Sequence, residues 1–414
     1  MTTRLYYHDS FLYEFNAVAL DVVSASSSEG RQAAILDQTA FYPTSGGQVF
    51  DTGVLMPSGG KQQVRVVEVS ERDDGTILHI LEDPVTLDKG THVHGTIDVE
   101  RRRDHMQQHS GQHVLSAAFV QLFNMPTVSF HMGEDYCSID LDTKSLSPQQ
   151  VEAAEKLSNE IVMENRQVGI RFVTQDEARE LGLRKLPPAD KDELRLIEIY
   201  DFDLTACGGT HVRQTGQIGS ILLRKIEKVK QGWRVEFICG NRAITTARRD
   251  YATLSEAAGL LSTHLWDVPQ QIRKTQEEQR ASRKSREQLL EELADLSAVR
   301  LLAETPESNG RKIVVRTYAD RDLPYIKLLA QRLTRQSTPV IALLGATQGQ
   351  PAIVFAQSPR QPFDMGALMK EALAKLGGRG GGSKDMAQGG PQEAGKIAEV
   401  LADLHACLNA AKPN

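Results

Sequence analysis

Two short segments, one with two histidines and one with a cysteine and a histidine, constrain this 414-residue chain more than any other feature. The first, HSGQH, places His109 and His113 four residues apart, so that on a helix both imidazoles lie on one face. The second, CGGTH, places Cys207 and His211 on a glycine-containing turn after a predicted strand. Together the four side chains offer the nitrogen and sulfur donors that suit Zn²⁺, and we predict a zinc site.

Each segment taken alone is more typical of ordinary surface or core histidine than of a metal ligand. His105 even forms a second HxxxH pair with His109 on the same stripe. Two classes of zinc enzyme are disfavoured by what the segments lack. The glutamate of the HExxH proteases is missing, and no HxE motif precedes a PCxxC motif as in nucleobase deaminases.

Composition and charge exclude several other classes. The formal net charge of −6 argues against a protein that coats DNA, although a local basic patch can still bind nucleic acid. We expect no signal peptide, because the first residues lack a basic stretch followed by an apolar one, and no apolar run comes near the roughly 20 residues that span a bilayer. Its four cysteines form no CxxC pair, which indicates a reducing compartment. We therefore expect a cytoplasmic protein without a membrane segment.

Differences in local pattern divide the chain into four parts. Residues 1–90 contain short predicted strands broken by Gly, Pro, Asp and Ser clusters, which is typical of a small β-barrel. Residues 91–245 mix helices and strands, 246–305 are polar and helix-prone, and 306–414 alternate strands with helices. We predict an α+β protein: a barrel-like subdomain, an α+β core, a long connecting helix and a C-terminal α/β domain.

Some elements can be predicted individually. Apolar residues recur at helical spacing over 102–123, Ser147 begins a helix with capping-box spacing, and a hairpin turns near Lys230. A glycine-rich loop precedes the last helix. The end of the long polar helix carries apolar residues at roughly heptad spacing: Leu289, Leu293, Leu296 and Val299. This spacing leaves two interpretations open, a solvated connecting helix and a coiled coil.

Several motifs, taken in order, are similar to one family. HSGQHVLSAAF, followed about ninety residues later by CGGTHV, resembles the editing domain of alanyl-tRNA synthetases and of the AlaX proteins. The segments DQTAFYPTSGGQVFDTG, TVSFHMG and WRVEFICGNRA are similar to motifs of the same family. GGRGGGSKDMAQGG resembles the DHHA1 domain. The resemblance covers nearly the whole chain and is to the long AlaX type, which has the predicted order of parts.

The resemblance implies hydrolysis of the ester that joins serine, or glycine, to the terminal ribose of tRNA(Ala). An alanine-activating site discriminates poorly against these two amino acids by size, and a second, hydrolytic site is the remedy. His109, His113, Cys207 and His211 match the family's metal positions, so Zn²⁺ is the implied cofactor. If one coordination position opens for water or substrate, we expect His211 to be the ligand that leaves.

Polar residues of two motifs are candidates for the same site. In TVSFHMG, Ser129 is nearest to the family's hydroxyl-reading position, although it could also be an ordinary strand serine. The glycine-rich motif could line the cleft or only pack the N-terminal part against the core. Candidates for catalysis are Thr39, Gln48, Ser129 and His131, and candidates for substrate binding are Thr44, Gly46, Gly47 and Thr127.

A tRNA partner requires local cations, because the total charge is acidic. Basic residues gather on the predicted hairpin, where they could contact phosphates: Arg224, Lys225, Lys228, Lys230 and Arg234. The glycine-rich C-terminal segment could hold RNA through its amides and cations, or serve as a flexible linker. Its candidate RNA-binding residues are Arg379, Gly380, Gly381, Gly382 and Lys384. We also expect this domain to support a homodimer.

Two absences separate this sequence from the larger proteins that share its motifs. Too few residues precede the barrel for an aminoacylation domain, so we expect editing in trans rather than charging of tRNA. No DHH motif accompanies the DHHA1-like part, so phosphoesterase activity is not expected. Two alternatives of other classes stay open: a catalytically idle tRNA-binding protein of the same fold, and a metallohydrolase for another small ester or amide.

Overall fold

A computed structural model of the chain describes residues 2–24, 31–59, 63–83, 87–181, 183, 193–347 and 349–410. The chain forms two compact units, Met1–Glu256 and Ala257–Asn414. Helices and sheets of mostly antiparallel strands occur in both units, which confirms the α+β class. Within the described residues, no helix combines the length and the apolar character needed to span a bilayer. The boundaries predicted at residues 90, 245 and 305 stay predictions.

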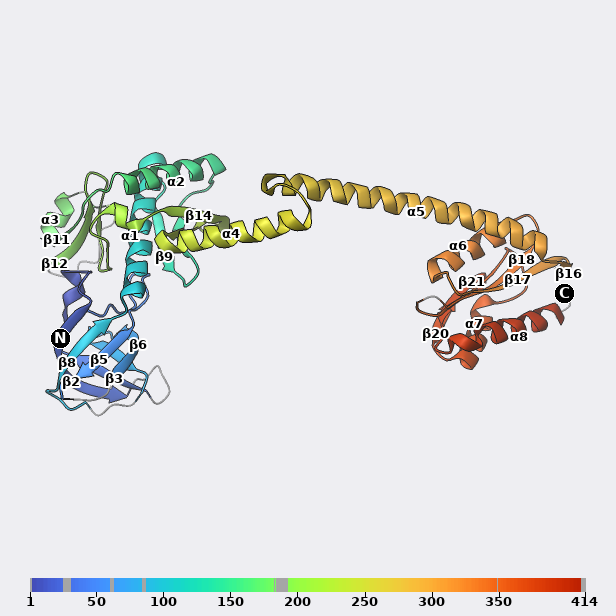
Figure 1. The fold of residues 1–414 in the computed structure, drawn as a ribbon, viewed down its shortest axis with the longest axis horizontal. Coiled ribbons are helices and arrows are strands. Elements are labelled where there is room, and N and C mark those ends of the chain that lie inside the picture. The colour runs from blue at the N-terminus through green and yellow to red at the C-terminus, as the bar shows by residue number, and fades with distance from the viewer. Residues whose placement is uncertain are drawn as a thin grey trace. The chain divides into compact units, whose positions relative to one another are not determined.

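A closed barrel forms the N-terminal part of the first unit, drawn in blue in Figure 1. Neighbouring strands follow the order β2-β3-β7-β6-β5-β8, and closure leaves no unpaired edge. The predicted small barrel is thus confirmed. Its strands are β2 (Glu14–Ser24), β3 (Gln32–Leu36), β5 (Gly53–Pro57), β6 (Val64–Glu71), β7 (Ile77–Leu81) and β8 (His92–Ile97). Outside the barrel, β1 (Thr3–Arg4) pairs in parallel with β4 (Gln38–Thr39).

Helix α1 (Val99–Phe123) follows the barrel and is buried along most of its length. It begins three residues before the predicted start, because the Asp98 side chain accepts a hydrogen bond from the first turn. Arg102 attaches the helix to the barrel through a buried ion pair with Asp51 and hydrogen bonds to two backbone carbonyl oxygens. Loss of either partner would leave an uncompensated buried charge, so this ion pair strongly favours the observed attachment of α1 to the barrel.

Two antiparallel sheets complete the first unit. One has the order β14-β15-β10-β9 and the other β11-β12-β13. Their strands are β9 (Thr127–Met132), β10 (Cys137–Leu141), β11 (Val168–Thr174), β12 (Glu193–Ile199), β13 (Asp203–Ala206), β14 (Ile221–Val229) and β15 (Gly232–Cys239). Helices α2 (Pro148–Met163) and α3 (Gln175–Glu180) connect them. Both predicted features are confirmed: Ser147 forms a capping box with Gln150, and the β14–β15 hairpin turns at Lys230.

The second unit contains a six-stranded sheet of order β16-β17-β18-β19-β21-β20. Helix α4 (Gly240–Leu260) crosses the unit boundary, and the long helix α5 (Val268–Glu304) follows. The remaining elements are β16 (Glu307–Ser308), β17 (Arg311–Tyr318), α6 (Leu323–Thr334), β18 (Val340–Ala346), β19 (Ala352–Gln357), α7 (Met365–Leu376), β20 (Arg379–Gly382), β21 (Met386–Gly390) and α8 (Ile397–Ala410). The predicted strand–helix alternation is confirmed.

One prediction for this unit is wrong, namely that the glycine-rich segment before the last helix is a loop. The glycine-rich segment forms the antiparallel strands β20 and β21, with Lys384 in the turn between them. Glycine is needed here because the hairpin packs closely against α7. A Cβ at Gly380 or at Gly389 would lie 2.7 or 2.8 Å from the Leu373 side chain. The backbone that could have held RNA as a loop is therefore part of a strand pair.

Candidate metal centre

Helix α1 supplies two of the four predicted metal ligands. His109 and His113 lie one turn apart, and both are almost fully buried. Gly111, on the opposite side of the helix, lets α1 pack against β15, since a Cβ there would lie 2.2 Å from the Cys239 sulfur. This close packing helps to hold the two imidazoles in their direction.

The other two ligands lie on the turn that follows β13. Arg195, on β12, holds this turn, because its Nη1 donates to the carbonyl oxygens of Cys207 at 2.6 Å and Gly209 at 3.0 Å. Only glycine fits at position 209, where a Cβ would lie 2.1 Å from the His109 ring. The turn can therefore approach α1 closely enough for Cys207 and His211 to reach the two helical histidines.

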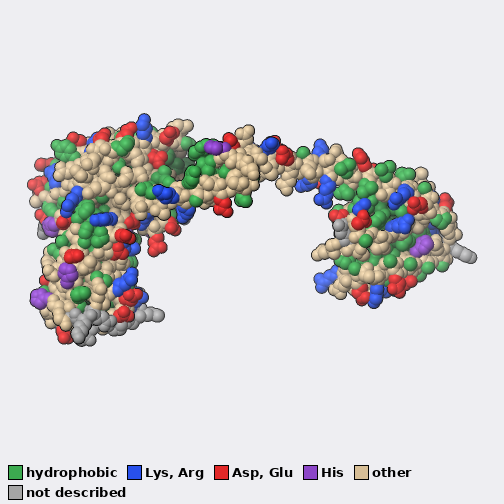
Figure 2. All heavy atoms as spheres, in the orientation of Figure 1, with side chains coloured by type: hydrophobic (Ala, Val, Ile, Leu, Met, Phe, Trp, Pro, Cys, Tyr) green, Lys and Arg blue, Asp and Glu red, His purple; other side chains and the backbone are tan. Residues whose placement is uncertain are grey.

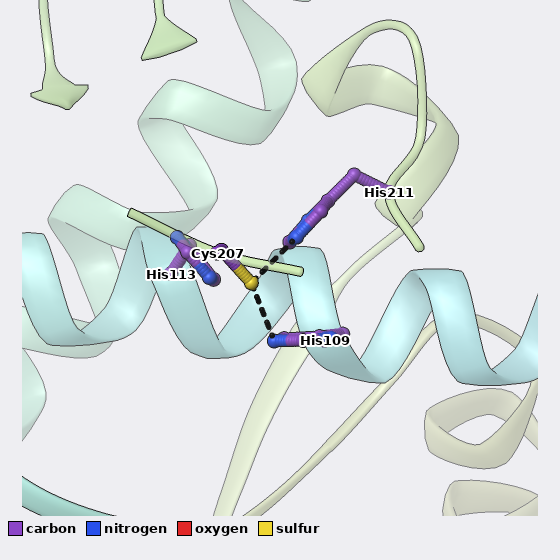
Figure 3. Close-up of side chains that lie close together, drawn as sticks. All are labelled: His109, His113, Cys207 and His211. Carbon is purple, nitrogen blue, oxygen red and sulfur yellow. Dashed lines mark hydrogen bonds between the residues drawn. The ribbon is translucent and has the colours of Figure 1, made fainter. Parts of the chain in front are cut away.

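The four side chains point toward one another, as Figure 3 shows. The Cys207 sulfur lies 3.4 Å from Nε2 of His109 and 3.3 Å from Nε2 of His211. Candidate ligand atoms of all four residues lie within 4.8 Å of one another. Tetrahedral Zn²⁺, with Zn–S of about 2.3 Å and Zn–N of about 2.05 Å, separates sulfur from nitrogen by about 3.5 Å. The donor set and its spacing thus fit a zinc ion.

Buried polar groups hold the second nitrogen of two of these imidazoles. Nδ1 of His109 lies 2.7 Å from Oε1 of Gln48, and Gln48 is itself held by Thr210 through a 2.9 Å hydrogen bond. Nδ1 of His211 lies 3.1 Å from the hydroxyl oxygen of Ser110. Such partners set the tautomer and leave Nε2 free to bind a metal.

The electrostatics of the cluster favour a deprotonated cysteine. Burial raises the pKa of the Cys207 thiol, but His109 and His211 outweigh it and hold that pKa well below its usual value. Burial lowers the pKa of His113, but the Asp203 carboxylate at 3.6 Å and the Cys207 sulfur outweigh burial and raise that pKa to about 9. The thiolate is the form of cysteine that ligates metals.

A cleft of about 650 Å³ opens beside the cluster. His109, His113 and Cys207 line this cleft, whereas His211 is not among its lining residues. Phe130, on β9, forms part of the wall and stacks on His109 with ring centroids 5.4 Å apart. His211, the ligand that we expected to leave, is thus the one of the four that does not line the cleft.

A tight turn of the barrel subdomain forms another wall. Gly46 and Gly47 occupy its two central positions with φ of +56° and +86°, and mutual 3.0 Å hydrogen bonds between Ser45 and Gln48 close it. Both φ values lie in the region that favours glycine. Gly47 also packs against Phe130, where a Cβ would lie 2.6 Å from the carbonyl oxygen. The glycine-rich motif thus reaches the cleft.

Three of the predicted substrate or catalytic residues line this cleft, namely Gly46, Thr127 and Ser129. The Ser129 hydroxyl donates to the Asp140 carboxylate at 2.7 Å. Arg234 holds Asp140 through two further hydrogen bonds, of 2.7 and 3.0 Å. Because its proton is engaged in this way, the Ser129 oxygen can accept a hydrogen bond from a group in the cleft.

Other predicted residues lie elsewhere. Gln48 is fully buried behind His109. Thr39 is fully buried in the barrel, where it bonds to His79. The exposed side chains of Thr44 and His131 are not among the residues that line the cleft. The structure therefore does not bring Thr39, Thr44 or His131 to the site, and Gln48 acts on it only through a ligand.

Sequence reasoning missed several residues that shape the cluster. For Ser110 the sequence offered a signal, because this residue lies between the two histidines of HSGQH. For Asp203 and Arg195 the sequence offered no signal, because the pairing of β12 with β13 brings them to the cluster. Phe130 was visible within TVSFHMG, but the alternation of a strand does not reveal which face meets the metal ligands.

Three family models match successive parts of the chain. Residues 3–101 match the class II (A) tRNA synthetases, 194–236 the threonyl and alanyl tRNA synthetase second additional domain, and 307–410 the DHHA1 domain. The alanyl-tRNA editing protein AlaX-L of Pyrococcus horikoshii is 31% identical over 392 residues, which cover 94% of each chain. The chain belongs to the AlaX-L family.

Alanine–tRNA ligases form a second group of relatives, and the similarity covers only part of their length. The alanine–tRNA ligase of Pyrococcus furiosus is 31% identical over 414 residues, and that of Archaeoglobus fulgidus 33% over 401 residues. These alignments cover 98% and 95% of this chain but only 44% and 42% of the ligases. The chain thus spans less than half the length of the curated ligases. A solved C-Ala domain of Aquifex aeolicus alanyl-tRNA synthetase aligns with 26% of the chain at 20% identity and a TM-score of 0.24.

Proposed function

We propose that the protein hydrolyses the ester of tRNA(Ala) mischarged with serine or, less efficiently, glycine, and that it acts in trans on tRNA charged by another enzyme. One observation carries the proposal: three of the four clustered candidate ligands, His109, His113 and Cys207, line a cleft built jointly by the barrel turn, β9 and the CGGTH turn. The name of the Pyrococcus horikoshii relative, an alanyl-tRNA editing protein, supports it.

Zinc is the cofactor that this donor set suits. His109, His113, Cys207 and His211 would hold the ion, and a bound Zn²⁺ supplies a Lewis acid beside the ester. The chain itself orients the ligands, since Gln48 and the other buried partners fix the imidazole rings. Walls of the cleft exclude water from one side of the substrate and position its ester next to the cluster.

Selection of serine would depend on the free lone pairs of Ser129. A serine hydroxyl can donate to the Ser129 oxygen, whose own proton is engaged by Asp140, whereas alanine and glycine cannot. One such hydrogen bond contributes about 1 kcal/mol, which is roughly a fivefold preference. We expect Ser129→Ala to lower the preference for seryl over glycyl esters by about this factor.

Deacylation of three substrates tests the proposal. Seryl-, glycyl- and alanyl-tRNA(Ala) are incubated with the protein, with and without a chelator. We expect loss of the seryl ester first, little loss of the alanyl ester, and no hydrolysis after chelation. His109→Ala and Cys207→Ala should lose both bound metal, measured by elemental analysis, and activity. Retention of metal and full activity in either variant would show that the zinc assignment is wrong.

The same experiment separates the alternatives. Binding of tRNA without hydrolysis of any ester would favour a non-catalytic tRNA-binding protein of this fold. Equal hydrolysis of unrelated small esters would favour a general metallohydrolase. Either result would contradict the proposed function.

A further inference from the structure

Basic residues of the β14–β15 hairpin differ in whether a carboxylate neutralises them. Positive and negative side chains intermingle over the face in Figure 2, so ion pairing decides which cations stay available. Three of the five hairpin cations are paired: Arg224–Asp250, Lys225–Glu227 and Arg234–Asp140. Lys228 and Lys230 are exposed, and their ammonium groups make no hydrogen bond or ion pair with the described residues.

These two lysines share a groove of about 560 Å³ with a third, Lys144. The Lys144 ammonium is also exposed and is not paired with any described residue. Asp142 is the one carboxylate among the groove's described lining residues. The lining therefore carries three positive charges against one negative charge, in a protein whose total charge is negative.

Close backbone packing holds the segments that carry the three lysines, namely strand β14, the hairpin turn and the loop after β10. Trp233 donates from Nε1 to the carbonyl oxygen of Lys144 at 3.4 Å, which ties the loop after β10 to β15. Gly232, the first residue of β15 after the hairpin turn, approaches β10 so closely that a Cβ would lie 2.0 Å from the Leu141 carbonyl oxygen. These contacts fix the backbone that carries the three lysines, and a fixed backbone lowers the entropic cost of binding a ligand.

The groove adjoins the cleft at the metal centre. Val128 lines both and is 53% exposed. Strand register shifts at this point: Asp140 pairs with Ser129 but Leu141 with Thr127, so Val128 is the extra residue of a β-bulge. A bulge redirects one side chain out of the regular alternation. Val128 consequently forms the shared wall between the cleft and the basic groove.

We propose that this groove binds the phosphodiester backbone of the unpaired nucleotides that lead to the esterified terminal ribose. The proposal rests on the proposed function, which places that ribose in the cleft. A ribose bound there continues directly into a chain of phosphates, each with one negative charge, and the lysine-lined groove begins at the wall of the cleft. Unpaired cations along a groove are the usual way to bind single-stranded nucleic acid without reading its sequence.

A matched pair of variants tests the groove. The groove variant carries Lys144→Ala, Lys228→Ala and Lys230→Ala. A control variant removes the same charge from exposed lysines outside the groove: Lys89→Ala, Lys156→Ala and Lys284→Ala. For both we measure kcat/KM over a range of salt with two substrates, seryl-tRNA(Ala) and seryl-adenosine, which has no phosphate. Metal content and unfolding midpoint check that the fold is intact.

We expect the groove variant to lose about tenfold in kcat/KM for seryl-tRNA at low salt, and to retain its rate with seryl-adenosine. The slope of log kcat/KM against log salt should become shallower by about 2, since each single-strand phosphate contact contributes about 0.7. The control variant should stay within about twofold of the unmodified protein for both substrates. Equal values for groove and control variants at every salt concentration would overturn the proposal.

Failure of the proposed function can be told apart from failure of the groove. If the unmodified protein hydrolyses neither substrate, the function is wrong, and the groove is judged by binding of a single-stranded RNA with the tRNA 3′ sequence. Weaker binding by the groove variant than by the control would still support it. Equal binding would overturn it.

Discussion

Asp203 illustrates how one residue can act on the cluster without lining the cleft. Its carboxylate lies 3.6 Å from Nδ1 of His113, and both side chains are almost fully buried. A carboxylate behind a metal-binding imidazole orients the ring and raises its basicity. We expect Asp203→Asn to lower zinc affinity about 10- to 100-fold, measured by competition with a chelating dye.

Asp201→Asn is the matched control for this change. Asp201 is exposed and has a φ of +53°, a conformation that asparagine adopts as readily as aspartate. Its zinc affinity should equal that of the unmodified protein. An equal loss in both variants would mean that net charge, rather than the contact with His113, determines the effect.

His79 makes the barrel sensitive to acid. Its ring is fully buried between the Ala34 carbonyl oxygen at 3.0 Å and the Thr39 hydroxyl at 2.8 Å, and burial lowers its pKa from 6.5 to about 4. As pH falls, the unfolded chain therefore binds a proton before the folded chain does. Stability that is fully present above pH 6.5 is lost as pH falls toward 4, by about 3 kcal/mol.

Urea unfolding at pH 7.5 and pH 4 measures this loss, with His79→Gln as the comparison. Glutamine does not titrate, so the variant should start less stable but lose about 3 kcal/mol less on acidification. The same pH dependence in both proteins would contradict the assignment to His79.

At the scale of elements, the turn at Gly46 and Gly47 distinguishes the free-energy cost of a side chain at positive φ from the cost of a steric clash with β9. Both residues have positive φ, which disfavours a side chain by about 1 kcal/mol. A Cβ at Gly46 meets nothing within 4 Å, whereas one at Gly47 would lie 2.6 Å from the Phe130 carbonyl oxygen. Gly46→Ala should thus lower the free energy of unfolding by about 1 kcal/mol and Gly47→Ala by about 2–4 kcal/mol.

Chemical denaturation checks these two values, and deacylation adds a second readout. Gly47→Ala should also slow hydrolysis, because Phe130 must move away from His109. Equal destabilisation by the two substitutions would show that backbone strain alone, and not contact with β9, makes glycine necessary.

Local signals predicted some elements well and others poorly. The capping box at Ser147 was readable because both of its hydrogen bonds join residues three apart. The glycine-rich segment was not, because its pairing as a hairpin depends on packing beneath Leu373 of α7. In α5 the heptad-like leucines are exposed, as Leu289 and Leu296 show, which agrees with a solvated connecting helix, while Ala294 and Ala298 are the buried positions. Small residues that pack closely carry little weight in a hydrophobic pattern.

At the scale of the whole molecule, the cleft and the glycine-rich hairpin belong to different units of the chain. The first unit contains all four candidate ligands and a core of its own. Deleting 265–414 should therefore weaken affinity for tRNA more than turnover of saturating substrate. We expect KM for seryl-tRNA(Ala) to rise about tenfold or more, with kcat changed less than threefold.

Steady-state kinetics and a filter-binding assay measure the two effects. Unchanged affinity would show that the second unit does not bind RNA, and that Arg379 and Lys384 have another role. A large fall in kcat with unchanged KM would show instead that the second unit supports the cleft.

The sequence by itself singled out the four candidate ligands, because HSGQH and CGGTH carry them at spacings that suit a helix and a tight turn. It also determined the barrel, the hairpin and the order of parts, which follow from local periodicity. Only the tertiary structure decided which polar residues serve the cleft. Thr39 bonds inside the barrel, Asp203 lies behind His113, and three of five hairpin cations are paired. Those outcomes depend on contacts between residues far apart in the chain, which no local pattern records.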